Sequence, residues 1–314
     1  MGMLWTLWIP SFSLAEPIPA AETQTFATFA QWCKARSRLS PETQQTIEVL
    51  LKQTDTTDCD RAQTQLSELT QLNLSQDNLS DIRPLATLTH LTSLNLSFNQ
   101  IRDIHPLEPL TSLIELDLSA NQIAEINTLS ALSQLTFLSL GNNQIAQLEP
   151  IGQLKQLTRL QLARNQIIDL APLAELTQLN ILDLSNNQIA DIYPLSQLTA
   201  LTILSLGRNQ ITEIRPIAQL AHLHILILKH NQVAQLSPLT ELIGLTRLDL
   251  SNNQITDLSP LSTLINLREL SLAQNQIADY RALSELKNLT DLDLRDNPIP
   301  DRACPRQPDS ICRF

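Results

Sequence analysis

An asparagine returns every 22 residues through most of this 314-residue chain, and no other feature restricts its possible folds so strongly. Each asparagine follows a Leu-x-Leu pair such as Leu94 and Leu96, and the same pattern begins one step earlier with Asp77 in the asparagine position. A fixed period in this range indicates a solenoid of stacked repeats. The sequence therefore predicts eleven coils over residues 67–298. The asparagines are Asn99, Asn121, Asn143, Asn165, Asn187, Asn209, Asn231, Asn253, Asn275 and Asn297.

Each repeat has two halves with different hydrophobic periods. In the first half Leu94 and Leu96 alternate with polar residues, which is typical of a short strand with one buried face. In the second half Ile101 and Ile104 lie three residues apart, and Pro106 removes a hydrogen-bond donor. A tight 3₁₀-like turn suits this half best. We therefore expect each repeat to form one coil.

The asparagines lie at the bend between the two halves, where the backbone turns inward and leaves amide and carbonyl groups without partners. An asparagine side chain carries both donors and an acceptor, so it can bond to its own coil and to the neighbouring coil. The series therefore predicts a structural ladder along the array.

The repeat pattern resembles leucine-rich repeats of the 22-residue class, found in bacterial internalins and in the regulatory subunit of protein phosphatase 1. The motif Leu-x-x-Leu-x-Leu-x-x-Asn-x-Ile-x-Asp-Ile-x-Pro-Leu occupies residues 91–107 and recurs over about three quarters of the chain. The resemblance implies an α/β curved solenoid with a parallel β-sheet on the concave face and short 3₁₀ turns on the convex face. It implies binding, without indicating a ligand.

The first fifteen residues differ from the rest of the chain. An apolar run ends in Ser13-Leu14-Ala15, with small residues where a signal peptidase needs them, so we interpret residues 1–15 as a signal peptide and 16–24 as a short lead segment. No basic residue precedes Lys34, which leaves a core-packed or disordered segment as the alternative. The run is shorter than the ~20 residues that a membrane span needs, so we expect no membrane span.

Both ends of the array are expected to carry caps, because uncovered terminal coils would expose a layer of leucines. Residues 25–66 show the apolar spacing of helices, including Phe26, Phe29 and Cys33, and predict a helical N-terminal cap. After Asn297 several prolines end the repeat, so residues 299–314 are expected to form the C-terminal cap.

The four cysteines lie in the two caps and not in the array. They are Cys33, Cys59, Cys304 and Cys312. Two local disulfides, one in each cap, are expected, and they indicate an oxidising location. Four reduced, buried thiols are the alternative, whereas a shared zinc ion would require the ends of a sheet about 50 Å long to meet.

Composition and motifs exclude several functions. With 21 Lys and Arg against 32 Asp and Glu, the net charge of −11 argues against a nucleic-acid surface. The carboxylate pairs Glu115–Asp117 and Asp291–Asp293 have a spacing that would suit catalysis or calcium, but alternation on a solvated strand explains them, and no inserted loop forms a pocket. We expect no enzyme, no cofactor and no metal.

The middle of the array carries the candidate binding site. Large aliphatic side chains and basic side chains gather there at outward positions, while acidic residues, including Glu115, Glu269, Asp291, Asp293 and Asp296, lie toward the two ends. Such a patch is typical of a contact site for an acidic partner. The alternative is that isoleucine is present only because it favours β-strands, and that the patch is incidental. The candidate residues are Phe137, Arg159, Arg164, Ile181, Ile203, Arg208, Ile225, Ile227, Lys229, His230 and Arg247.

These features predict a non-enzymatic, monomeric scaffold, secreted or held in the periplasm or cell envelope, that binds a protein or an extracellular polymer through its concave face. Two alternatives stay open. One is an intracellular regulatory subunit that binds an enzyme such as a phosphatase, and the other is a purely structural role in the envelope.

Overall fold

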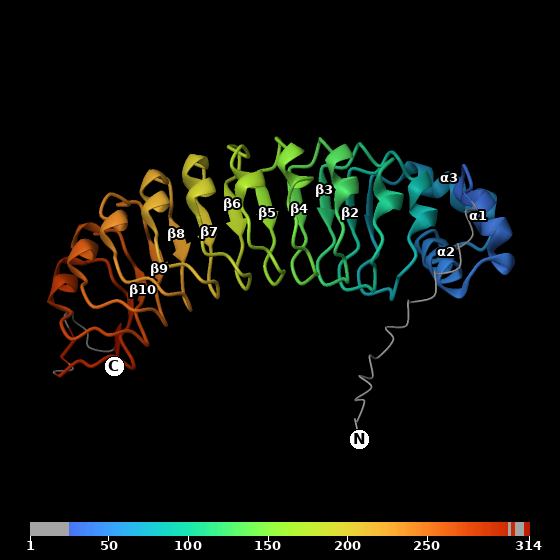
Figure 1. Ribbon diagram of the computed structural model, residues 1–314. Coiled ribbons are helices and arrows are strands. Elements are labelled where there is room, and N and C mark those ends of the chain that lie inside the picture. Colours follow the sequence, from blue (N-terminus) through green and yellow to red (C-terminus); the bar gives the residue numbers. More distant parts are fainter. Residues whose placement is uncertain (1–24, 301–302, 305–310) are drawn as a thin grey trace, which may run out of the picture.

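The computed structural model describes residues 25–300, 303–304 and 311–314. Figure 1 shows a curved solenoid whose coils follow one another in chain order, with the helical cap at one end and short helical turns along the upper, convex side. The strands form one parallel sheet in the order β1 to β12. The expected signal peptide and lead segment lie outside the described residues.

The N-terminal cap consists of α1 (Phe29–Ala35), the 3₁₀ turn η1 (Arg36–Arg38), α2 (Pro41–Gln53) and α3 (Cys59–Glu68). Helix α2 begins where Ser40 accepts a hydrogen bond from the Thr43 amide, and α3 begins where Asp58 accepts from two amides. The Cys33–Cys59 disulfide joins α1 to α3, as the sequence predicted. The cap contacts the first coil through Thr46, which donates to the Asp81 carbonyl.

Eleven three-residue strands lie one coil apart, and a two-residue strand completes the sheet. Their registers align equivalent leucines, so that Leu94 pairs with Leu116 and Leu116 with Leu138. The central leucine of each three-residue strand is buried, so the other two side chains point to the opposite face of the sheet. The strands are β1 (Gln71–Asn73), β2 (Ser93–Asn95), β3 (Glu115–Asp117), β4 (Phe137–Ser139), β5 (Arg159–Gln161), β6 (Ile181–Asp183), β7 (Ile203–Ser205), β8 (Ile225–Ile227), β9 (Arg247–Asp249), β10 (Glu269–Ser271), β11 (Asp291–Asp293) and β12 (Cys312–Arg313).

Short 3₁₀ turns return the chain after each of the strands β1 to β10, as the three-residue period predicted. An aspartate two residues before several of them accepts a hydrogen bond from the first turn amide, as Asp103 does from His105 at 2.9 Å. The turns are η2 (Arg83–Thr87), η3 (His105–Leu107), η4 (Asn127–Ala131), η5 (Ile151–Gln153), η6 (Ala171–Leu173), η7 (Tyr193–Gln197), η8 (Arg215–Gln219), η9 (Ser237–Leu239), η10 (Ser259–Thr263) and η11 (Arg281–Glu285).

The asparagine side chains bridge neighbouring coils. Asn187 accepts a hydrogen bond from the Ile167 amide of the preceding coil at 3.0 Å. Its Nδ2 donates to the Leu162 carbonyl of that coil and to the Leu184 carbonyl of its own coil, both at 3.0 Å. The same set of bonds recurs from Asn99 to Asn297. The ladder therefore satisfies main-chain groups that the bend would otherwise leave unpaired.

The residue before each asparagine position adopts a left-handed conformation, with φ between 54° and 63° from Gln76 to Asp296. None of these residues is glycine. Asparagine, aspartate and histidine tolerate this region, whereas residues such as Phe98 and Ala120 are strained in it, and the asparagine bonds hold the bend in place. A column of side chains therefore runs along the sheet where the strands end.

The eleven predicted coils are present, and β12 adds a twelfth strand beyond the last repeat. Leu292 pairs with Cys312, and the Leu294 amide donates to the Arg313 carbonyl at 2.7 Å. The predicted Cys304–Cys312 disulfide holds this short segment in place. A two-residue strand has no alternation to detect, yet it covers the edge of the last coil.

Candidate binding face

The first residues of the central strands form a row that runs across the sheet, here called the strand row. Register places these side chains next to one another, so that Ile203 lies between Ile181 and Ile225. All three isoleucines are half-buried, because neighbouring side chains in a parallel sheet cover one another. The row consists of Phe137, Arg159, Ile181, Ile203, Ile225 and Arg247.

Two arginines flank the isoleucines of the strand row. The Arg159 guanidinium lies over the Phe137 ring, 5.6 Å from its centroid, and leaves the charge facing solvent. Arg247 lies 3.3 Å from the Glu269 carboxylate, and both side chains are about half exposed, so solvent screens this pair. The strand row therefore has an apolar centre with a cation at each end.

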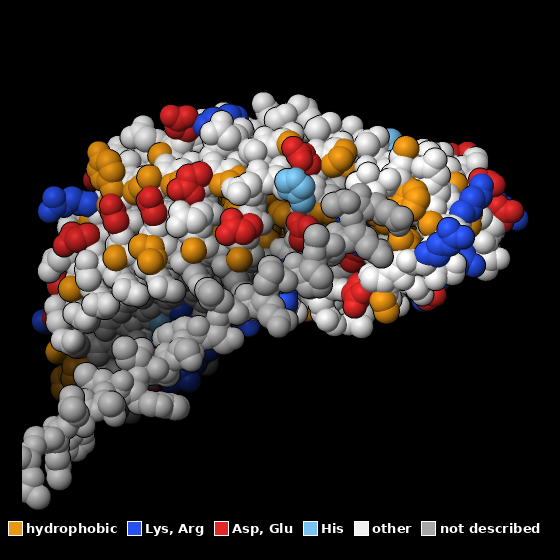
Figure 2. Space-filling view, turned by 45° about the vertical axis from the view of Figure 1, so that its right-hand side comes forward, with side chains coloured by type: hydrophobic (Ala, Val, Ile, Leu, Met, Phe, Trp, Pro, Cys, Tyr) orange, Lys and Arg blue, Asp and Glu red, His pale blue; other side chains and the backbone are white. Residues whose placement is uncertain are grey.

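A second group of predicted residues lies where the strands end. Arg164, Arg208 and His230 occupy the left-handed position of their coils, with φ of 58°, 58° and 54°. The two arginines line a hollow of about 520 Å³, and Figure 2 shows blue Lys and Arg side chains inside the shaded hollow of the molecule. The hollow is lined by Arg164, Ser185, Asn186, Ser205, Gly207, Arg208, Ile227, Lys229, Arg247 and Asp249.

Gly207 keeps this hollow open. A Cβ atom at this position would come within 3.1 Å of Lys229 Cγ and 3.6 Å of Ile227 Cγ2. Any side chain here would therefore push into the space between the two neighbours. Ile227 belongs to this hollow and not to the strand row, because it is the third residue of its strand.

Electrostatics around His230 agree with a basic hollow. Partial burial lowers the pKa of His230 below 6.5, and the nearby charges of Arg208 and Lys229 lower it further. The imidazole is therefore neutral at neutral pH, and the positive charge of the hollow comes from the arginines and lysine.

A second hollow, of about 400 Å³, adjoins the first. It is lined by Phe98, Asp117, Ser119, Ala120, Ser139, Gly141, Asn142, Gln161, Ala163, Arg164 and Asp183. Phe98 is 62% exposed and holds the left-handed position of its coil. Sequence reasoning missed Phe98, although it is the one large apolar residue in that column of side chains.

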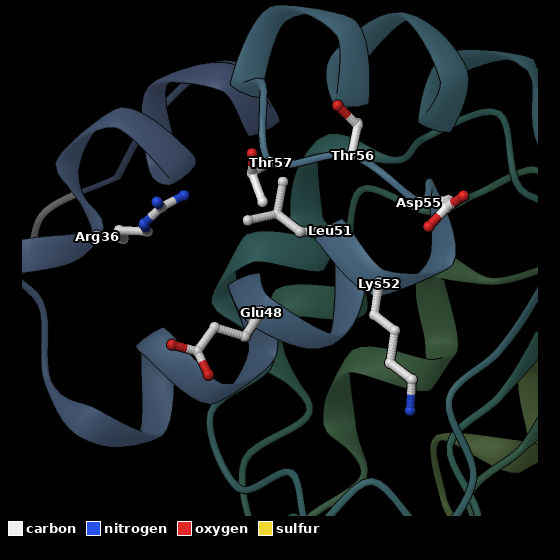
Figure 3. A pocket seen from close by; sticks show the side chains of 7 residues that line it. All are labelled: Arg36, Glu48, Leu51, Lys52, Asp55, Thr56 and Thr57. Carbon is white, nitrogen blue, oxygen red and sulfur yellow. The ribbon is translucent and has the colours of Figure 1, made fainter.

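A hollow of about 710 Å³ also lies in the N-terminal cap, between η1, α2 and the loop that follows α2 (Figure 3). Its lining carries both signs of charge, with Arg36 and Lys52 against Glu48 and Asp55. The two carboxylates come from different turns, and among residues 25–300, 303–304 and 311–314 no group of His, Cys, Asp or Glu could hold a metal ion.

One acidic position was wrongly assigned to the solvated end of the sheet. Asp293 is only 4% exposed, and Arg295 holds its carboxylate at 2.6 Å. Hydrogen bonds from Arg295 lower the pKa of Asp293, against an opposing effect of burial. Arg313 of the added strand also pairs with Asp291 at 2.7 Å. This carboxylate pair is therefore neutralised by arginines and is a structural feature of the C-terminal cap.

The geometry defines a class of protein by itself: a repeat solenoid with one open, parallel sheet along its concave face. The chain belongs to the leucine-rich repeat family, since the family model for leucine-rich repeats in two copies matches it from residue 67 onward. The matched segments are 67–110, 111–153, 155–197, 177–219, 199–241, 221–263, 243–284 and 265–302. No curated protein sequence matches the chain.

Solved structures place the chain beside the internalins. It is 34% identical to an internalin, InlF, from Listeria monocytogenes, over 82% of this chain and 76% of that one, with a TM-score of 0.77. The functional domain of InlJ from the same organism is 26% identical over 87% of this chain and 57% of that one, with a TM-score of 0.68. Such folds are typically binding scaffolds without catalytic activity.

A receptor ectodomain is similar as well. The leucine-rich repeat ectodomain of the Arabidopsis receptor kinase HAESA, solved with a peptide hormone ligand, is 26% identical over 72% of this chain and 42% of that one. The TM-score is 0.63. In the part of this chain that the structure describes, no helix has the length and apolarity to cross a membrane.

Proposed function

We propose that this protein is an exported, non-enzymatic scaffold that binds a partner protein through the centre of its concave face. The observation that carries the proposal is the strand row, in which Ile181, Ile203 and Ile225 form one half-exposed apolar surface between two arginines. Contiguous apolar area on an exposed sheet is typical of a contact site, and surrounding charges guide the partner to it.

A protein fits this surface better than a small molecule does. The strand row extends over six coils, which at ~4.8 Å per strand is about 24 Å from Phe137 to Arg247. A standard protein interface needs a surface of this length, whereas a small ligand needs an enclosed pocket. The HAESA ectodomain, which was solved with a peptide ligand, supports a polypeptide partner for this fold.

Export is supported by the chain's ends. Both caps contain a disulfide, which persists in oxidising compartments. The apolar run before Ala15 fits a signal peptide. The competing function, an intracellular regulatory subunit, requires reduced cysteines and an intact N-terminus. Intact-mass spectrometry of the native protein separates the two, because export requires the loss of about fifteen residues and two oxidised pairs.

The binding surface is tested with the double variant Ile203→Asp/Ile225→Asp. Its matched control is Ile243→Asp/Ile265→Asp, which places the same charges in neighbouring coils on side chains 58% and 54% exposed, away from the strand row. A partner captured from the source organism's envelope fraction should be lost with the first variant and kept with the control. Equal capture by both double variants would exclude the strand row as the binding surface, and unfolding of the first would show that its side chains serve the core.

A further inference from the structure

We propose that the two adjoining hollows form one groove that seats an extended, acidic segment of the partner, with an apolar residue of that segment against Phe98. This inference rests on the proposed function and names the chemistry of the segment that the concave face receives. The groove lies beside the strand row, at the ends of the strands.

The two hollows meet at Arg164. This side chain lines both of them, and its backbone is left-handed, with φ of 58°. Between Phe98 and Lys229 the second position before each asparagine is occupied by small residues, including Gly141 and Gly207, so no large side chain stands at this position of the groove. A single segment can therefore lie along its whole length.

The length of the groove fits a short extended peptide. Five repeats of 22 residues separate Phe98 from Arg208. At ~4.8 Å per strand this is about 24 Å, and an extended chain advances ~3.3 Å per residue, so about seven residues span the distance. The segment would cross the strands at nearly a right angle, because the groove follows the column of side chains from coil to coil.

The basic side chains at one end of the groove favour acidic side chains at the corresponding end of the bound segment. Among the described residues, no carboxylate lies within ion-pair distance of Arg164, Arg208 or Lys229. Asp249 of this hollow accepts from the Ser251 hydroxyl, and Asp183 of the adjoining hollow accepts from the Ser185 hydroxyl, so both carboxylates are engaged within their own coils. The basic side chains are therefore available to a carboxylate from outside, and charge-assisted bonds to arginine are strong.

The outer side of the molecule has the opposite charge. An acidic residue follows the asparagine position by four residues in most coils, and Figure 2 shows red Asp and Glu side chains along the outer surface. These residues are Asp81, Asp103, Glu125, Asp169, Asp191, Glu213, Asp257 and Asp279. An acidic segment is therefore repelled from the turns and attracted to the groove.

The other end of the groove distinguishes a peptide from a uniformly charged polymer. It contains no basic side chain before Arg164, and its lining includes Asp117 and the exposed Phe98 ring. A polymer with an anion at every unit would place charges against Asp117 and Phe98. A polypeptide can place an apolar side chain there and its carboxylates three coils away.

Binding of labelled eight-residue peptides to the full chain tests the groove. One peptide carries a leucine at its first position and three acidic residues in its last four, a second has the reverse order, and a third replaces the acids by their amides. We expect one of the acidic peptides to bind and the amide peptide to bind at least about tenfold more weakly, one decade being about 1.4 kcal/mol. No binding of either acidic peptide at about 1 mM, or equal binding of the amide form, would overturn the proposal.

The double variant Arg164→Gln/Arg208→Gln locates the site. Glutamine already occupies this left-handed position at Gln76 and Gln274, so the variant should fold. It should weaken acidic-peptide binding by about tenfold or more, whereas the control Arg102→Gln/Arg215→Gln, which removes the same charge outside the groove, should leave affinity within about twofold. Equal affinities of the two variants would contradict the proposal.

Two further experiments test the apolar contact at Phe98 and distinguish a polypeptide ligand from an anionic polymer. Phe98→Ala places at this position the residue that Ala120 already supplies in the next coil. This variant should bind the leucine peptide more weakly, and it should bind a peptide with serine in place of the leucine with unchanged affinity. A sulfated oligosaccharide that binds more tightly than the peptides and loses binding with Arg164→Gln/Arg208→Gln would overturn the polypeptide assignment. If neither acidic peptide binds while Ile203→Asp/Ile225→Asp still abolishes partner capture, the groove is not the site of an acidic segment and the proposed function stands. If capture survives that change, the proposed function itself fails.

Discussion

Replacing Asn187 by alanine should destabilise the middle of the array because it removes one rung of the ladder. The change leaves the Ile167 amide without its acceptor. The carbonyls of Leu162 and Leu184 each lose one of two asparagine donors and keep the bond from Asn165 or Asn209. The perturbation is confined to hydrogen bonding, since the smaller side chain fits the same backbone position.

The magnitude follows mainly from the one orphaned amide. An orphaned buried polar group costs about 1–3 kcal/mol, and the two carbonyls add less because each keeps a partner. Asn187 itself is half-buried, so water reaches part of the site. We therefore expect a loss of about 2 kcal/mol in the free energy of unfolding.

Urea unfolding followed by circular dichroism measures this loss. The control is Gln188→Ala, because the Gln188 side chain is exposed and its main-chain amide keeps its bond to the Ile167 carbonyl at 2.9 Å. That variant should lose less than about 0.5 kcal/mol. Asn187→Asp is informative as well, because the carboxylate still accepts from Ile167 but faces two carbonyl oxygens. It should be at least as unstable as the alanine variant.

Equal unfolding midpoints for Asn187→Ala and Gln188→Ala would refute the ladder argument. A third result, Asn187→Asp as stable as the wild type, would show that acceptance from the Ile167 amide is the only bond that matters. The donated bonds to Leu162 and Leu184 would then contribute nothing measurable.

Two other predictions concern the C-terminal end. Replacing Cys304 and Cys312 by serine should free β12, with a local loss of about 2–3 kcal/mol from the closed loop, and faster hydrogen exchange of the Leu294 amide measures it. Hydrogen bonds from Arg281 hold the pKa of Asp279 at about 2, against 3.8 for an unperturbed aspartate. The stabilising effect of this carboxylate is therefore complete above pH 3.8 and is lost as pH falls through about 2. An NMR titration should show the pKa returning toward 3.8 in Arg281→Ala, and an unchanged pKa would exclude this cause.

The sequence predicted most of the fold because the determining contacts are periodic and local. The Leu-x-Leu pairs specify which face of each strand is buried, and the asparagines specify where the chain bends. The cap disulfides could be predicted because each pair lies within one short segment. The strand β12 could not, because its pairing depends on a disulfide and on contacts between Arg313 and the preceding coil.

The candidate site was predictable only in part, for a related reason. Alternation along a strand is sufficient to assign Ile203 and Ile225 to the solvent side. It does not show how deep the surface is at the bend, where Gly207 opens a hollow and Phe98 lines its continuation. The burial of Asp293 likewise depends on arginines that approach from outside its own strand.

Site-specific photo-crosslinking tests the central claim most directly. A photoreactive residue would replace Ile203 in the strand row or, as the matched position, Ser259 at the start of η10 on the convex side. We predict a covalent adduct with the captured partner from position 203 and none from position 259. An adduct from position 259 with none from position 203 would contradict binding through the concave face.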